Sequence, residues 1–325
     1  MNPQLQMIKI PFDVQPEIYA SLVEKMKGAF FLDSSDLAHQ GSRYSYFSYK
    51  PLKNHVGLKA FEELSPESSH WLNQPASHDF WSGGYLGVIP YPDADGHGSA
   101  NTWFGFYEAV IVVDERKQET FAASLFLNKK ELQKWVDDFT ELALEIKLAP
   151  ESDEEISSQW VNYPPFDEYQ KCFERIQEYL CAGDIYQVNL TQAFQVKTRA
   201  TSAKVYKQLR KNNPSPYAAF INLGNQYVLS ASPELFFKID GGIIQTKPIK
   251  GTKKRVSDEI RDQNLRQELV DSLKDRAELL MITDLERNDL GKICEIGSVK
   301  VEKLCELESF AAVHHLVSTI SGRLK

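Results

Sequence analysis

The chain has 325 residues, of which 42% are hydrophobic and 25% are charged, and it carries a net charge of -8. This balance is typical of a globular protein with one large or two average domains. The negative charge argues against a nucleic-acid partner, which would favour a basic face, and no apolar run approaches the ~20 residues that cross a bilayer.

The first half of the chain predicts short strands followed by one long helix. Strands are expected at residues 29–32, 44–49, 104–113 and 120–126, and helices at 16–26 and 129–148, where apolar residues recur at helical spacing. The glycine-rich run at 83–87 lacks the Lys-Ser/Thr ending of a phosphate-binding loop, so it predicts a tightly packed strand instead.

The clearest boundary is the segment from Ala149 to Pro165, which holds an acidic run and a Pro-Pro pair. We therefore expect an N-terminal region over residues 1–150, a linker over 151–165 and a second region over 166–325.

The second half predicts a mixture of long helices and grouped strands. A helix is expected from Phe166 to Ala182, with Gly183 at the position after its end, and a longer helical pattern covers residues 258–288. Strands are expected at residues 186–196, 217–223, 226–230, 235–239, 242–246, 297–304 and 314–322. Strand groups mixed with helices, without strict alternation, predict an α+β fold.

The four cysteines lie at positions 172, 181, 294 and 305, which is neither a metal-ligand nor a redox spacing. The N-terminus lacks the apolar core of a signal peptide. We therefore expect reduced thiols in a cytoplasmic protein.

Lys250 stands in the most informative segment, residues 246–252, directly after an alternating apolar run. Pro248 fixes its own φ and Gly251 permits a left-handed backbone, so Lys250 is presented on a shaped turn. The neighbouring cations are Lys247, Lys253, Lys254 and Arg255. Like charge disfavours protonation, and a neutral amine is a nucleophile or a base. The local alternative is a solvated basic turn.

Five further strings occur in a characteristic order around this segment. They are GDIYQVNL (183–190), SPELFF (232–237), DRAE (275–278), DLERNDLG (284–291) and VHHLVST (313–319). Together with PIKGT (248–252), they resemble the chorismate-utilising enzymes, which include the anthranilate, isochorismate, salicylate and aminodeoxychorismate synthases. Anthranilate synthases carry Ala where this chain has Lys250, so the resemblance points to the branch of aminodeoxychorismate synthase component I.

The resemblance implies both a fold and a reaction. The fold is a large two-sheet β-sandwich flanked by helices, to which the N-terminal half contributes strands. The reaction converts chorismate plus ammonia to 4-amino-4-deoxychorismate with Mg²⁺. In this branch the lysine, here Lys250, adds to C2 of chorismate as the C4 hydroxyl leaves, and ammonia then enters at C4.

The resemblance also implies roles for other residues. Glu234 is expected to be the general acid and base, in an apolar setting supplied by residues 235–237. His315 is expected to be a donor or an orienting group near the chorismate ring or its C4 oxygen. Gly251 and Thr252 are expected to bind substrate. The local alternatives are a surface carboxylate for Glu234 and a satisfied core group for His315.

The same resemblance implies that Glu278 is the magnesium ligand, and its carboxylate suits Mg²⁺, which takes oxygen donors and usually keeps waters. The alternative is a surface ion pair with Lys274, four residues earlier on the same helix. Ser42 and Arg43 match, loosely, a region where relatives bind tryptophan, and the alternative there is an ordinary strand. Arg287 and Asp289 are expected to fix the end of the helix.

Two absences shape the remaining expectations. Relatives continue beyond the VHHLVST segment and carry a second magnesium glutamate there, so we expect the chain to be truncated at its C-terminus and not to complete the active site alone. No cysteine lies in the Gly-x-Cys-x-Gly elbow of an amidotransferase. Ammonia would therefore come from solution or from a separate glutamine amidotransferase subunit.

Three readings of the function remain open from the sequence. The first is aminodeoxychorismate synthase component I. The second is anthranilate- or salicylate-type chemistry on the same scaffold, and Lys250 argues against the anthranilate branch. The third is a truncated, non-catalytic module that binds a ligand or partner.

Overall fold

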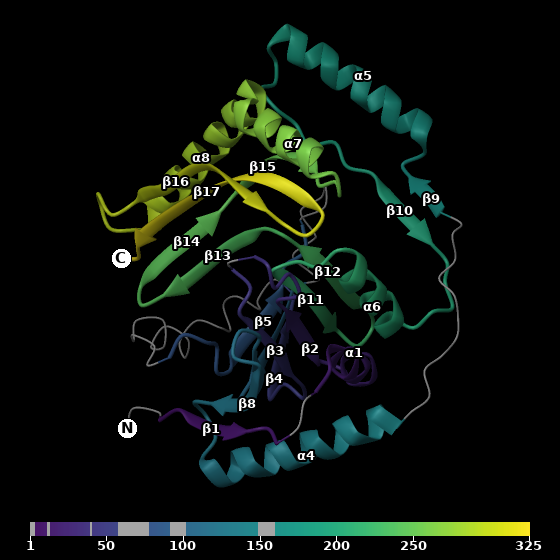
Figure 1. Cartoon of the computed structure of the whole chain (residues 1–325), viewed down its shortest axis with the longest axis vertical. Helices are drawn as coiled ribbons and strands as arrows, with labels where there is room; N and C mark the ends of the chain where they lie inside the picture. Colours follow the sequence, from purple (N-terminus) through teal and green to yellow (C-terminus); the bar gives the residue numbers. More distant parts are fainter. Residues whose placement is uncertain (1–3, 12–13, 40, 58–77, 92–101, 149–159) are drawn as a thin grey trace. The chain divides into compact units, whose positions relative to one another are not determined.

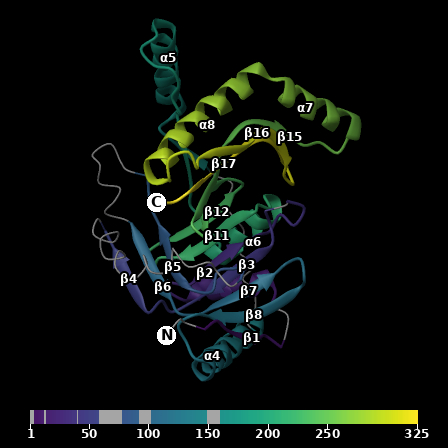
Figure 2. The ribbon, with the colours of Figure 1, turned by 90° about the vertical axis from the view of Figure 1, so that its left-hand side faces the viewer.

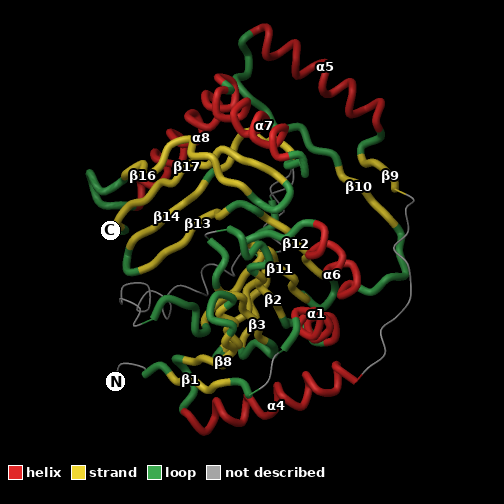
Figure 3. Tube along the Cα trace, in the orientation of Figure 1, coloured by secondary structure: helices red, strands yellow, loops and turns green. Residues whose placement is uncertain are grey.

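A computed structural model describes residues 4–11, 14–39, 41–57, 78–91, 102–148 and 160–325. The chain falls into two compact units, one formed by Met1–Ala149 together with Tyr206–Lys325 and the other by Pro150–Val205. Strands and helices alternate irregularly along the chain (Figure 3). The predicted α+β fold is confirmed.

A seven-stranded antiparallel sheet forms the N-terminal half of the larger unit, in the order β1-β8-β7-β3-β2-β11-β12 (Figure 1). Its strands are β1 (Gln6–Lys9), β2 (Phe30–Asp33), β3 (Tyr44–Ser48), β7 (Val110–Asp114), β8 (Glu119–Ser124), β11 (Tyr217–Asn222) and β12 (Tyr227–Ser232). Because β11 pairs with β2, segments on either side of the smaller unit belong to one sheet.

Two helices, α1 (Pro16–Lys25) and α4 (Lys129–Leu148), pack on one face of this sheet. Tyr19 of α1 stacks on Phe31 of β2, with 5.0 Å between ring centroids, and lies 6.3 Å from Phe139 of α4. These rings are fully buried and form the apolar core between helices and sheet. A separate three-stranded sheet has the order β4-β6-β5, with β4 (Lys53–Val56), β5 (Gly84–Val88) and β6 (Trp103–Tyr107).

The C-terminal sheet carries most of the residues that the sequence singles out. It contains β13 (Leu235–Asp240), β14 (Ile243–Lys247), β15 (Ile249–Lys254), β16 (Lys300–Ser309) and β17 (Val313–Arg323). The central strand β17 pairs with β14 and β15 along one edge and with β16 along the other. The helices α7 (Glu259–Asp271) and α8 (Leu273–Ile293) cover one face of this sheet (Figure 2).

The smaller unit contains an antiparallel strand pair and one helix. They are β9 (Trp160–Tyr163), β10 (Ala193–Val196) and α5 (Phe166–Ala182), and α6 (Ser202–Asn212) spans the boundary to the larger unit. The helix α5 ends at Gly183, which has φ 80°, as its position after the helix predicts.

Three expectations for individual elements are wrong, and one helix was missed. The strand expected over 104–113 is two strands in different sheets, because the carbonyls of Glu108 and Ala109 accept hydrogen bonds from serine hydroxyls instead of strand partners. The helix expected over 258–288 is two helices, since the Ser272 side chain accepts from the Asp275 amide and begins α8. Of the strand expected over 186–196, only β10 forms, and α6 was not expected.

All four cysteines are free thiols, as expected, and two of them, Cys294 and Cys305, are buried. Within the described parts of the chain, no helix combines the length and hydropathy needed to span a membrane.

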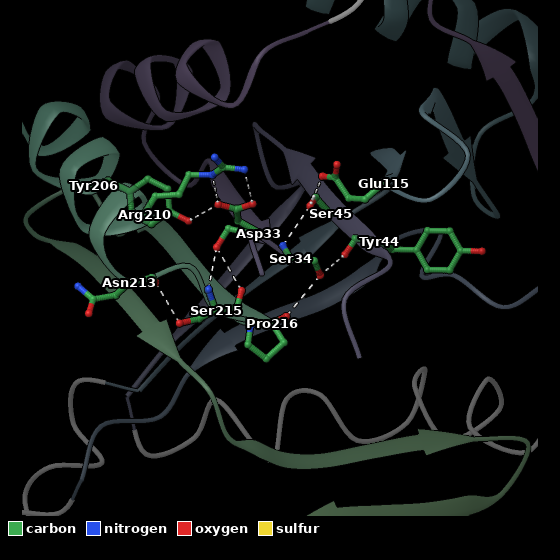
Figure 4. A network of polar contacts seen from close by, with 11 residues as sticks. Asp33, Ser34, Tyr44, Ser45, Glu115, Tyr206, Arg210, Asn213, Ser215 and Pro216 are labelled. Atoms are coloured by element: carbon green, nitrogen blue, oxygen red, sulfur yellow. Dashed lines mark hydrogen bonds and ion pairs between the residues drawn. The ribbon is translucent and has the colours of Figure 1, made fainter. Parts of the chain in front are cut away.

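One buried ion pair connects the N-terminal sheet to α6 (Figure 4). The side chain of Asp33 is fully buried, and its Oδ2 accepts hydrogen bonds from Arg210 Nε at 2.6 Å and from the Tyr206 hydroxyl at 3.1 Å. Burial raises the pKa of Asp33, and the charge and hydrogen bond of Arg210 oppose that effect. The ionised carboxyl therefore depends on Arg210.

Candidate active site

Lys250 and Glu234 meet at a single residue, Ile249. Glu234 lies in the turn between β12 and β13, and its Oε1 accepts the Ile249 N–H at 2.8 Å. The Nζ atom of Lys250, on β15, donates to the Ile249 carbonyl at 3.0 Å. The structure thus brings the expected nucleophile and the expected acid together at the start of one strand, although they are 16 positions apart in the sequence.

The apolar enclosure expected around Glu234 is not formed. Glu234 is exposed, and the side chains of Phe236 and Phe237 are 79% and 50% exposed. The reason is that β13 is an edge strand of its sheet. The rings of Phe236 and Phe237 therefore do not shield the Glu234 carboxylate from water.

Gly251 lies at an irregularity in the pairing of β15 with β17, between Lys250 and Thr252. Its φ is +75°, and an added Cβ would lie 2.9 Å from Asp275 Cβ and 3.0 Å from Leu269 Cδ1. A side chain at this position would therefore be strained and would clash with α7 and the start of α8. The glycine lets β15 lie close to the helices.

His315 of β17 is buried opposite Thr252. Its Nδ1 lies 3.2 Å from the Gly251 carbonyl and 3.0 Å from Thr252 Oγ1. Since the carbonyl can only accept, Nδ1 carries the proton, which leaves Nε2 as the acceptor of a neutral ring. Burial lowers the pKa of His315, and the hydrogen bond to Gly251 and the charge of Glu234 oppose that effect. The neutral ring is therefore favoured.

Further contacts connect His315 to the N-terminal segment. The ring of Phe310 meets the ring of His315 edge-on, with 5.3 Å between centroids, and stacks on the ring of His39 at 4.6 Å. His39 Nε2 lies 2.9 Å from Glu308 Oε2, and Lys247 Nζ donates to Glu308 Oε1 at 2.6 Å. The N-terminal segment therefore supports the turn between β16 and β17, which precedes His315.

Glu308 gives a testable pH dependence. Burial raises the pKa of its carboxyl, but hydrogen bonds and charges from His39 and Lys247 outweigh burial and lower the pKa from 4.5 to about 2. A lowered pKa contributes stability that is present above pH 4.5 and is lost as the pH falls toward 2. The shift corresponds to about 3 kcal/mol of unfolding free energy.

We expect Glu308→Gln to destabilise the protein by up to about 3 kcal/mol at pH 7 and by less than half as much near pH 3, as measured by urea denaturation. Glu306→Gln is the matched control, because Glu306 pairs with Lys303 while both side chains are about half exposed. An equal loss for Glu308→Gln at both pH values would contradict the assignment.

Helix α8 presents two half-buried carboxyl groups, Glu278 and Glu286. Glu278 is the expected magnesium ligand, and Glu286 was not assigned a role from the sequence. Burial raises the pKa of Glu286, the charge of Glu234 adds to that effect, and Lys250 opposes it. Glu286 is therefore within electrostatic reach of both residues at Ile249. Eight residues after Glu278, it lies about 80° further round the helix, so helical periodicity alone did not mark it.

Arg287 and Asp289 were expected to fix the end of the helix, and this expectation is wrong, because α8 continues to Ile293. They form exposed ion pairs with Asp284 and Lys292, respectively. In the described part of the chain, no group of three or more His, Cys, Asp or Glu side chains is arranged to hold a metal ion.

The basic cluster around Lys250 is largely paired with carboxylates. Lys247 contacts Glu308 at 2.6 Å and Lys253 contacts Glu268 at 3.0 Å. Arg255 lies 4.0 Å from Asp262. The cations that flank Lys250 in the sequence are thus compensated, which weakens the argument from like charge.

Ser42 and Arg43 lie in different environments. Ser42 is buried, and its hydroxyl has no hydrogen-bond partner among the described residues. Arg43 forms ion pairs with Asp79 and with Asp114, the latter at 3.2 Å. Arg43 lines a surface cavity of about 320 Å³, and the binding of tryptophan in this region stays a prediction.

Comparisons with known proteins find a family model and several curated relatives that match this chain. The family model for chorismate binding enzymes matches residues 35–325. The chain is 35% identical to aminodeoxychorismate synthase component 1 of Klebsiella aerogenes, over 98% of this chain and 76% of that protein. It is 38% identical to aminodeoxychorismate synthase component 1 of Salmonella typhimurium, over 75% of this chain and 54% of that protein.

A solved structure shares the fold. The crystal structure of anthranilate synthase component I from Streptococcus pneumoniae superposes with a TM-score of 0.69 at 24% identity, over 87% of this chain and 69% of that one. The chain thus spans between about half and three quarters of the length of these relatives.

Proposed function

Because the chain belongs to the chorismate binding enzyme family, we propose that it acts as aminodeoxychorismate synthase component I and converts chorismate plus ammonia to 4-amino-4-deoxychorismate. The observation that carries this proposal is the placement of Lys250 on β15, with its ammonium and the Glu234 carboxylate on the two sides of Ile249. A lysine at this position distinguishes the aminodeoxychorismate branch from the anthranilate branch. The distinction matters because the chain also shares its fold with an anthranilate synthase component I.

Lys250 would act as the nucleophile and Glu234 as the acid and base. The Lys250 ammonium first passes a proton to the Glu234 carboxylate. The resulting amine forms a bond to C2 of chorismate while the C4–O bond breaks, and the leaving oxygen takes that proton from Glu234, so that water is released. Ammonia then forms the C4–N bond as the C2–Nζ bond breaks, and Glu234 accepts a proton from the incoming nitrogen. Covalent catalysis replaces one difficult substitution by two easier steps.

His315 would orient the substrate through Nε2, since Nδ1–H is directed to Gly251 and Thr252. A neutral imidazole accepts a hydrogen bond at Nε2 from a substrate hydroxyl. The Thr252 hydroxyl lies beside it and can contact the same part of the ligand. Gly251 contributes through its backbone, because the bulge it permits sets the positions of Lys250 and Thr252.

Mg²⁺ would be held by Glu278, together with the ring carboxylate of chorismate and water. The half-buried carboxylate of Glu278 is the type of hard oxygen donor that Mg²⁺ prefers, and one or two protein carboxylates suffice. When bound, the ion would neutralise the substrate carboxylate.

A product assay tests the proposed function. The purified protein, extended to the full length of the relatives it matches, should convert chorismate and an ammonium salt to 4-amino-4-deoxychorismate as the main product in chromatography when Mg²⁺ is present, and chelation of Mg²⁺ should abolish it. Anthranilate or salicylate as the main product would instead assign the protein to another branch of the family. The absence of any chorismate binding in calorimetry would favour the non-catalytic module.

The nitrogen source is a separate prediction. None of the four cysteines lies in an amidotransferase elbow, and two of them are exposed on α5 while the other two are buried. We therefore expect turnover with ammonium salts and none with glutamine until a glutamine amidotransferase subunit is added. Release of glutamate and formation of product from glutamine by the purified chain alone would overturn this prediction.

A further inference from the structure

The hydroxyl group of Thr246, on β14, lies between two acceptors. Its Oγ1 is 2.6 Å from the carbonyl oxygen of Phe236 on β13 and 2.8 Å from Oε2 of Glu286 on α8. Thr246 is itself buried. Both distances are those of ordinary O–H···O hydrogen bonds.

The number of protons available at this contact indicates whether Glu286 is ionised or protonated. A threonine hydroxyl has one proton, and a carbonyl oxygen has none to give. If Thr246 donates to Phe236, its contact with Glu286 needs a proton from the carboxyl group. If Glu286 were ionised, two acceptors would compete for one proton, and at least one distance would lengthen. The geometry therefore fits a carboxylic acid at Glu286.

The surroundings of Glu286 favour the same state. Burial has the largest effect and raises the pKa of its carboxyl, and the negative charges of Glu234 and Asp289 act in the same direction. The Thr246 hydroxyl and the Lys250 ammonium oppose these effects. The net direction is toward the protonated form.

We propose that Glu286 is protonated at neutral pH and serves as a positioning residue, which donates a hydrogen bond to Thr246 and thereby holds the start of β13 next to α8. This role rests on the proposed function, because the start of β13 carries the turn with Glu234. A neutral link fixes that turn without placing a second negative charge beside Glu234, in a site that has to bind a dianionic substrate.

The protonation state can be measured without an activity assay. The infrared spectrum at pH 7 should contain the carbonyl band of a protonated carboxyl group that is missing from the spectrum of Glu286→Gln. Identical spectra in this region would overturn the proposal. This result does not depend on which product the enzyme forms, so it separates failure of the proposed state from failure of the proposed function.

A series of variants tests the positioning role. Glu286→Ala should lower kcat by about 10-fold or more with a smaller effect on KM, because the Glu234 turn loses its support. Glu286→Gln should recover most of that loss, since its amide N–H₂ can donate to Thr246 as the acid does. Thr246→Ser should resemble the wild type and Thr246→Val should resemble Glu286→Ala. Asp284→Asn is the control on the same helix, because Asp284 is 75% exposed.

The alternative is an ionised Glu286 that acts as a counter-ion of Lys250. In that case Glu286→Gln would lose as much activity as Glu286→Ala while remaining folded, and this outcome would overturn the proposal. Thermal unfolding provides a further check. The raised pKa of Glu286 contributes stability that is fully present below pH 4.5 and is lost as the pH rises. The melting temperature of the wild type should therefore fall relative to that of Glu286→Gln as the pH is raised.

Discussion

Replacing Lys250 by alanine is expected to lower the rate of 4-amino-4-deoxychorismate formation by more than about 10²-fold, which corresponds to about 2.7 kcal/mol of transition-state free energy. The reason is that the proposed nucleophile supplies a covalent path that no neighbouring group replaces. A residue that only positions the substrate would cost about 10-fold, or about 1.4 kcal/mol. Steady-state kinetics with chorismate and an ammonium salt measures the difference.

Lys253→Ala is the matched control for this experiment. Lys253 lies on the same strand, and its ammonium pairs with Glu268 while both side chains are at least a third exposed. We expect it to change the rate little. Trapping the reaction should also give a mass increase on the peptide that contains Lys250, in the wild type only. A Lys250→Ala variant that keeps most of its activity would show that the amine is not the nucleophile.

Replacing Arg210 by methionine is expected to lower the unfolding free energy by about 3–5 kcal/mol at pH 7, because it leaves the buried Asp33 carboxylate without its partner. The side chain of Asp33 is fully buried and that of Arg210 is 28% exposed (Figure 4). Tyr206 would remain as a neutral donor to the carboxylate, at 3.1 Å. Urea denaturation of the two proteins gives the difference.

The effect of this substitution should depend on pH. Burial raises the pKa of Asp33, so the carboxyl contributes stability below its unfolded pKa and loses it as the pH rises. The loss in Arg210→Met should therefore be smaller at pH 4 than at pH 7, where the unpaired group is ionised. A loss that is the same at both pH values would mean that packing of the arginine stem, and not charge, accounts for it.

A double substitution separates the two contributions. Asp33→Asn combined with Arg210→Met removes both charges, and we expect it to recover part of the stability. Arg287→Met is the surface control, since Arg287 pairs with Asp284 while their side chains are 51% and 75% exposed. If the double variant loses more unfolding free energy than the two single variants lose in total, a specific charge pair between Asp33 and Arg210 is contradicted.

The sequence by itself determined the elements with strong local patterns. The helix from Phe166 to Ala182 was predicted with its bounds because its apolar spacing and Gly183 are both local signals. In the C-terminal sheet, β13, β14, β16 and β17 overlap strands expected from alternating apolar residues, whereas β15 lies where a turn around Lys250 was expected. The ordered strings around PIKGT were sufficient to predict the family, which the match over residues 35–325 shows.

Only the tertiary structure decided which distant residues meet. The strand expected over 104–113 divides between two sheets because side chains from Ser48 and Ser124 bind the carbonyls at its centre. Asp33 and Arg210 are 177 positions apart, and no local pattern marks either as a partner of the other. Such pairs depend on which strands and helices become neighbours.

Dependence on packing between elements also explains why the sequence predicted Lys250 and His315 as site residues but missed Glu286. Lys250 and His315 stand in recognisable strings, and the pairing of β15 with β17 then brings their strands together. Glu286 stands in such a string too, but its role follows from the distance to Thr246, and that contact exists only because α8 packs on β14. Sequence patterns specify periodicity and chemistry along the chain. The protonation state and the partners of a buried group are set by the elements that pack against it in the folded protein.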